Sequence, residues 1–330
     1  MAVALPKNNM TAALAKLIDW FALQAATMWI PLANDQNPQL DEALQFLQGP
    51  GFVTDENLSA RIEFGSDKSN IHFRFPTPRP GGCVENNTVH GRLYRCAGRW
   101  QERPVIILLH GNSDSITYQF RYPRIVRKCN REGFNAATLV APNHFQRCPR
   151  GGGRQKNLDC LQIAESAAQA VAEIRAFTGW LLEEGCPAVG LWGISMGAWY
   201  AGMVACRDAR LNSVVMEVPG VRMNAFLERL ALRPGIRRRY PKVRELCARL
   251  NLTTLNLANI QPVIPKDNIL LIEGIYDLFA PRENVEDLWQ AWGQPSIWRL
   301  PHGHVSISTL GCAPGLTERV LRWLSPRMNE

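Results

Sequence analysis

Apolar residues change their spacing along the chain, and each spacing predicts a different element. Between residues 11 and 30 they recur every three or four positions, which predicts an amphipathic helix. Residues 38–47 favour a second short helix, which ends at the breaker cluster 49–51. Alternating apolar and polar positions then predict strands at 61–67, 71–76 and 91–97.

From residue 105 onward the apolar positions form continuous runs. The run 105–109 is typical of a strand buried on both faces of a parallel sheet. Comparable runs return at 136–141, 188–192, 213–218, 269–273 and 296–300. Helical patterns separate several of them, the clearest at 159–184, so the chain predicts βαβ units and a mostly parallel sheet. Ligand sites of such sheets lie at the carboxyl ends of the strands, where functional residues should therefore follow the runs.

The N-terminal helix has one apolar face, formed by Leu14, Leu17, Ile18, Phe21, Ala25 and Met28. We expect this helix to pack on the body of the protein, with docking on a membrane surface as the alternative. Lys16 and Asp19 interrupt the apolar run and no clean cleavage site follows, which argues against a signal peptide. No stretch of 18 uncharged apolar residues predicts a membrane-spanning helix.

Composition narrows the class of protein. Hydrophobic residues make up 46% of the 330 residues and charged residues 20%, which is the balance of a globular protein. The net charge of +8 is scattered rather than gathered on one stripe, so nucleic acid is not expected as a partner. The densest basic groups, at 121–131 and 237–239, are read as solvated faces or as a pocket rim for anionic substrates.

The nine cysteines contain no C-x-x-C pair, which suits neither a zinc site nor a disulfide framework. We therefore expect a reducing, cytoplasmic compartment, no metal site and no cofactor.

The strongest chemical signal follows the run 188–192 and reads Gly193-Ile194-Ser195-Met196-Gly197. A nucleophile on a sharp strand-to-helix turn needs small residues two positions before and after it, because larger side chains would clash with the neighbouring strand or helix. The strand before and the helical pattern after this pentapeptide supply that context. Ser195 is the candidate nucleophile, and Met196 is a candidate oxyanion donor through its backbone N–H.

A second element, His110-Gly111-Asn112-Ser113, follows the strand 105–109. A loop in this place can supply the second oxyanion N–H, and Asn112 is the candidate donor. His110 is expected to bond nearby loops rather than to carry a proton.

The candidate acid and base follow the last two runs. Asp277 follows the run 269–273 and could orient an imidazole, although it could also cap the next helix. Glu217 is the rival acid, and Asp287 lies inside a helix pattern, which disfavours it. In Pro301-His302-Gly303-His304 we choose His304 as the general base, with His302 as the alternative.

The order Ser195, Asp277, His304 and the motifs HGNS, GISMG, GIYD and PHGH resemble the α/β-hydrolase superfamily over residues 60–330. The pattern looks more like esterases and peptidases with a plain HG loop than like lipases with an HGGG loop. The resemblance implies an α/β fold with a mostly parallel eight-stranded sheet flanked by helices. It further implies a Ser-His-Asp triad that hydrolyses esters or related acyl bonds of a small-molecule substrate.

The resemblance also suggests a division of the chain. We expect an N-terminal helical extension at 1–60, a hydrolase core at 61–218 and 263–330, and a helical cap at 219–262. The basic segment 237–239, which is part of this cap, would lie near the pocket entrance and favour anionic substrates. The open alternatives are an acyl-CoA thioesterase or peptidase with the same triad, and a non-catalytic scaffold on the same fold.

Overall fold

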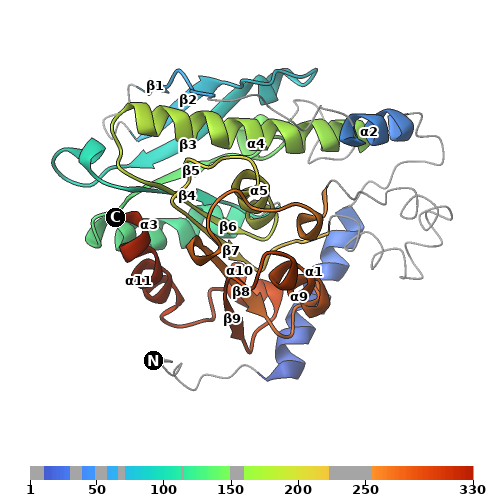
Figure 1. Ribbon diagram of the computed structural model, residues 1–330. Coiled ribbons are helices and arrows are strands. Elements are labelled where there is room, and N and C mark those ends of the chain that lie inside the picture. Colours follow the sequence, from blue (N-terminus) through green and yellow to red (C-terminus); the bar gives the residue numbers. More distant parts are fainter. Residues whose placement is uncertain are drawn as a thin grey trace.

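The computed structural model describes residues 11–29, 39–48, 58–65, 71–112, 115–148, 160–222 and 255–329. Its strands are β1 (Glu63–Phe64), β2 (His72–Pro76), β3 (Thr88–Tyr94), β4 (Val105–Leu109), β5 (Asn135–Leu139), β6 (Val189–Ile194), β7 (Ser213–Glu217), β8 (Ile269–Gly274) and β9 (Ser296–Leu300). They form one sheet in the order β1-β2-β3-β5-β4-β6-β7-β8-β9 (Figure 1). Neighbours are antiparallel from β1 to β5 and parallel from there to β9.

The sheet confirms the predicted fold class, with one correction. The resemblance implied eight strands, whereas the described residues form nine. The first strand, β1, lies within the predicted strand 61–67, and its two residues pair with Phe73 and Arg74 at the edge of the sheet. Every residue of β4 to β8 is buried, as the continuous apolar runs predict for strands covered on both faces.

Helices cover both faces of the sheet (Figure 1). They are α1 (Ala12–Trp29), α2 (Gln39–Gln48), α3 (Tyr122–Arg131), α4 (Cys160–Glu183), α5 (Met196–Ala205), α9 (Arg282–Ala291), α10 (His304–Ser308) and α11 (Leu316–Met328). Alternate residues of β4 belong to two cores, with Ile107 packed in the core of α4, α5 and α9 and Ile106 in that of α3 and α11. Burial on both faces fixes the strands, and hence the loops at their carboxyl ends.

The helix α1 packs on α10. Leu17 and Phe21 are 50% and 60% exposed, whereas Ala15, Asp19 and Leu23 are buried. The prediction that this helix packs on the body of the protein is confirmed, although Leu17 and Phe21 of its apolar stripe do not make the contact. The reason is a polar contact, since the Asp19 carboxylate is hydrogen-bonded to the backbone at the start of α10.

The predicted cap lies mainly outside the described residues, together with the arginines 237–239. Its last part, 255–262, is described and packs in the core with α5 and α9. The indole N–H of Trp199 donates to the Leu255 carbonyl, and that of Trp292 donates to the carbonyls of Leu257 and Ile260. This stretch therefore belongs to the packing of the core.

Seven cysteines of the described part are free thiols. Burial raises the pKa of Cys129, Cys186 and Cys206 to about 12, so these three are inert as nucleophiles at neutral pH. In the part of the chain that the structure describes, none of the helices combines the length and apolarity needed to cross a membrane.

Candidate active site

Ser195 lies at the turn between β6 and α5 with a backbone conformation that L-residues rarely adopt, at φ 55° and ψ −113°. A Cβ atom on Gly193 would run into the backbone of Gly197, and one on Gly197 would run into the Leu109 carbonyl. The two glycines therefore allow the turn to pack against α5 and β4. Such stored strain is typical of functional positions.

The side chains of Ser195, His304 and Asp277 lie in one hydrogen-bonded chain. His304 Nε2 is 2.9 Å from Ser195 Oγ, and His304 Nδ1 is 2.7 Å from Asp277 Oδ2. Because the carboxylate only accepts, we assign the proton to Nδ1, which leaves the Nε2 lone pair for the serine hydroxyl. This arrangement lets the imidazole take a proton from Ser195.

The Asp277 carboxylate is itself held in place. Its Oδ1 accepts hydrogen bonds from the N–H groups of Phe279 and Ala280, at 2.7 and 2.8 Å. The Phe279 ring stacks on the imidazole of His304, with centroids 4.7 Å apart. Sequence reasoning missed Phe279, because an aromatic residue two positions after the acid carries no recognisable pattern.

The structure directs the side chains of the rival residues to partners other than the Ser195 hydroxyl. Glu217 is fully buried and paired with Arg121 at 2.7 Å, and it also accepts from the Trp192 indole at 3.1 Å. Asp287 is ion-paired with Arg222. The backbone carbonyl of His302 accepts from Tyr276, and burial lowers the pKa of its imidazole.

One candidate oxyanion donor directly follows Ser195, and the other follows the strand β4, which neighbours β6 in the sheet. Met196 is the first residue of α5, and Asn112 follows β4, whose last residue approaches Gly197. His110, the first residue of the HG loop, stays neutral, because burial lowers its pKa to about 3. Its Nε2 accepts from Ala141 N–H and its Nδ1 donates to the Gly111 carbonyl, so His110 connects two loops.

Comparisons with known proteins agree with this architecture. A model of the family described as alpha/beta hydrolase domain containing 18 matches residues 66–221. The acetyl xylan esterase from Paenibacillus sp. R4 aligns over 92% of this chain and 98% of its own, with a TM-score of 0.55 and 13% identity. The esterase Pf2001 from Pyrococcus furiosus aligns over 91% and 99%, with a TM-score of 0.51 and 16% identity. The chain therefore has an α/β-hydrolase fold, and the family match covers residues 66–221 of it.

A sequence relative is found in Mycobacterium tuberculosis strain H37Rv. The uncharacterized protein Rv2627c is 30% identical over 254 residues, which cover 70% of this hydrolase-fold chain. The chain spans 58% of the length of that relative.

The HG loop that follows β4 is supported by His144, which sequence reasoning missed. His144 Nδ1 lies 2.8 Å from the Pro142 carbonyl and must donate to it, while its Nε2 lies 3.1 Å from the atom assigned as Asn112 Oδ1. Burial lowers the pKa of His144, so its Nε2 is an acceptor. We therefore orient the Asn112 amide with its NH₂ group toward His144.

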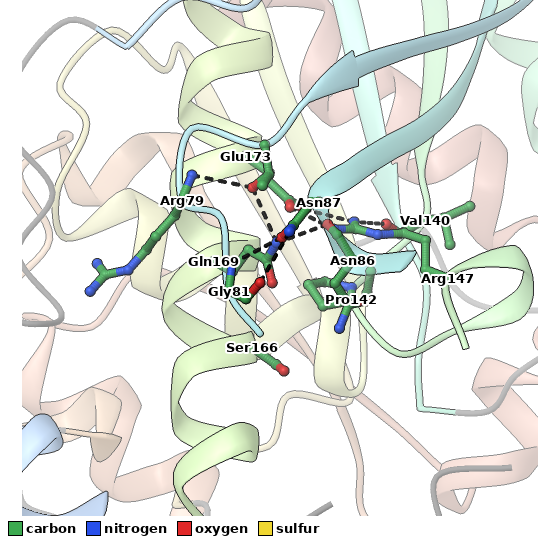
Figure 2. A network of polar contacts seen from close by, with 12 residues as sticks. Arg79, Gly81, Asn86, Asn87, Val140, Pro142, Arg147, Ser166, Gln169 and Glu173 are labelled. Carbon is green, nitrogen blue, oxygen red and sulfur yellow. Dashed lines mark hydrogen bonds and ion pairs between the residues drawn. The ribbon is translucent and has the colours of Figure 1, made fainter. Parts of the chain in front are cut away.

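A buried ion pair supports the loop that carries His144. Figure 2 shows the guanidinium of Arg147 directed at the carboxylate of Glu173, to which it donates at 2.6 and 2.8 Å. Arg147 also donates to the carbonyls of Val140 and Asn86, at 2.7 and 2.5 Å. The side chain of Asn86 in turn holds Asn143, which has a φ of 63°. These contacts fix the loop from Val140 to Arg147.

Replacing Glu173 by alanine is expected to destabilise the fold by about 3–5 kcal/mol, because the Arg147 guanidinium would stay buried without its partner. Urea unfolding would measure this loss. Glu165→Ala is the matched control, since Glu165 lies exposed on the same helix α4. Equal midpoints for the two variants would contradict a structural role of the ion pair.

Proposed function

We propose that this chain is a serine hydrolase that cleaves a carboxylic ester or a related acyl bond. The observation that carries the proposal is the hydrogen-bonded chain from Ser195 through His304 to Asp277, at 2.9 and 2.7 Å, on a strained strand-to-helix turn. A nucleophile, a base and a residue that orients the base are the parts that acyl transfer requires.

In the proposed reaction Ser195 Oγ attacks the acyl carbon while His304 Nε2 takes the hydroxyl proton. Asp277 holds the imidazole through Nδ1 and stabilises its positive charge. The N–H groups of Met196 and Asn112 donate to the oxyanion, and each such donor contributes about 3 kcal/mol to the transition state.

Collapse of the tetrahedral intermediate expels the leaving group, to which His304 returns its proton. Water then attacks the acyl-enzyme, with His304 as base again, and releases the acid and free Ser195. Each proton that leaves a nucleophile returns to a leaving oxygen, so no cofactor is needed.

The fold is shared by enzymes that act on different acyl bonds, so the class of substrate must be found by experiment. Two structural neighbours are esterases by name, which makes esters the first substrates to test. A panel of p-nitrophenyl esters, acyl-CoA thioesters and aminoacyl amides separates an esterase from a thioesterase or a peptidase.

The deciding test is covalent labelling with a fluorophosphonate. Wild type should be labelled once, at Ser195, and Ser195→Ala should not be labelled, because the probe requires a serine activated by a base. Ser325→Ala, on α11, is the control and should be labelled as wild type is. An unlabelled wild type would favour a non-catalytic scaffold on the same fold.

A further inference from the structure

Asp19 of α1 is a buried carboxylate that joins the two loops carrying Asp277 and His304. Its Oδ2 accepts from the N–H groups of Leu278 at 3.0 Å and His304 at 2.8 Å, and its Oδ1 accepts from Val305 N–H at 3.0 Å. The side chain is fully buried. One carboxylate thus bonds the residue after the candidate acid and the candidate base itself.

Two of the three N–H groups that Asp19 binds belong to the first turn of a helix. His304 and Val305 are the first two residues of α10, and the first N–H groups of a helix lack intrahelical acceptors. Asp19 supplies these acceptors from an element that is remote in sequence. Without it, the start of α10 would lose the contacts that orient its first turn.

Gly303 lies directly against the Asp19 carboxylate. A Cβ atom on Gly303 would lie 2.8–2.9 Å from the carboxylate atoms of Asp19, which is closer than real Cβ contacts. Its φ of −93° and ψ of 179° suit any residue, so the backbone conformation does not require glycine. The glycine of the PHGH motif is therefore needed for the space that Asp19 occupies.

The other end of α10 is also held by neighbouring elements. The carbonyl of Ser308 accepts from Arg121 at 2.6 Å and from the Thr117 hydroxyl at 3.1 Å. The Phe279 ring stacks on the imidazole of His304, so the side chain of this residue is held as well as the helix that carries it. Both the Phe279 ring and the Asp19 carboxylate connect α10 to the loop of Asp277, and Asp19 does so through hydrogen bonds to the backbone of both segments.

Placing a carboxylate here is costly for the fold. Burial raises the pKa of Asp19, and the nearby charge of Asp277 raises it further, although the three N–H donors oppose this. Apolar packing would hold α1 in place without that cost. A buried carboxylate at position 19 makes sense if its hydrogen bonds keep the loops of Asp277 and His304 in place.

We propose that Asp19 is a positioning residue, through which α1 sets the placement of His304 against Asp277 and Ser195. The inference rests on the proposed hydrolase function, and it gives the N-terminal helix a role in that reaction. Asp19 touches no reacting atom, so its removal should affect the rate of the chemical step more than substrate binding.

The first test compares Asp19→Ala, Asp19→Asn and Lys16→Ala in the full chain, with a p-nitrophenyl ester as substrate. Asp19→Ala should lower kcat by about 10- to 100-fold with KM within twofold, because small misplacements of catalytic groups have effects of this size. Asp19→Asn, which keeps one acceptor oxygen, should lie between Asp19→Ala and wild type. Lys16→Ala, exposed on the same helix, should equal wild type.

The second test uses Gly303 to disturb Asp19 from the opposite side. Gly303→Ala should lower kcat because its methyl group displaces the carboxylate. In the Asp19→Ala background the same change should have little further effect, since the space is then open. Losses that multiply in the double variant would overturn the proposal, as would a kcat of Asp19→Ala within threefold of wild type.

Hydrogen exchange separates this proposal from the proposed function. The amides of Leu278, His304 and Val305 should exchange faster in Asp19→Ala and at the wild-type rate in Lys16→Ala. Unchanged exchange overturns the role of Asp19, whatever the activity. Activity that survives in Ser195→Ala instead overturns the hydrolase mechanism, with the exchange result still valid.

Discussion

Replacing Ser195 by alanine is expected to lower kcat for an activated ester by about 10⁴- to 10⁶-fold. The nucleophile would be lost, and His304 would have no hydroxyl to deprotonate. Residual rate would come from substrate binding and from the oxyanion donors alone. Ester hydrolysis measured at saturating substrate gives this ratio directly.

The fold should survive this change. The Ser195 hydroxyl contacts His304, while the turn is held by backbone bonds such as Ser195 N–H to the Glu217 carbonyl at 2.9 Å. Thermal unfolding of Ser195→Ala should therefore match wild type. A loss of activity limited to about tenfold, in a folded variant, would show that another group is the nucleophile.

The parts of the structure that follow from local sequence could be predicted. Gly193 and Gly197 signal the turn because the clash they avoid involves residues close in the chain and the adjacent strand. The continuous run Val105–Leu109 signals a strand covered on both faces because apolar side chains point both ways. The choice of His304 and Asp277 as partners of Ser195 remains a prediction about chemistry, for which the distances supply support.

The parts that depend on remote polar contacts could not be predicted. In α1 the periodicity of Leu17 and Phe21 indicated an apolar face, yet Asp19 determines how the helix docks. Asp19 bonds a residue 285 positions away, and no spacing rule relates a carboxylate to a distant backbone N–H. Hydrophobic periodicity alone therefore did not reveal the face of α1 that carries the hydrogen bonds to α10.

The support of the HG loop was missed for the same reason. Arg147 and Glu173 look like two surface charges in the sequence, and only the fold brings them together as a fully buried pair. The available signal was Glu173 itself, because a charged residue within the mostly apolar helix α4 indicates a buried group that needs a partner.

The second large effect concerns the choice between rival residues. Asp277→Asn should lower kcat by about 10⁴-fold, because an amide can donate to Nδ1 and then stabilises the wrong tautomer of His304. Glu217→Gln should leave kcat within tenfold and instead lower stability by about 3 kcal/mol, since Arg121 would lose its buried partner. Kinetics and urea unfolding on the same two variants separate these outcomes.

The same comparison can be made for the two candidate bases, His304 and His302. His304→Ala should lower kcat by as much as Ser195→Ala does, because the serine and its base act as one unit. The double variant should therefore be no slower than either single variant. His302→Ala should keep kcat within tenfold, since the backbone of His302, rather than its ring, bonds the Tyr276 loop. If His302→Ala were the inactive variant and His304→Ala the active one, the base would be His302, and the 2.9 Å contact of His304 with Ser195 would be without catalytic meaning.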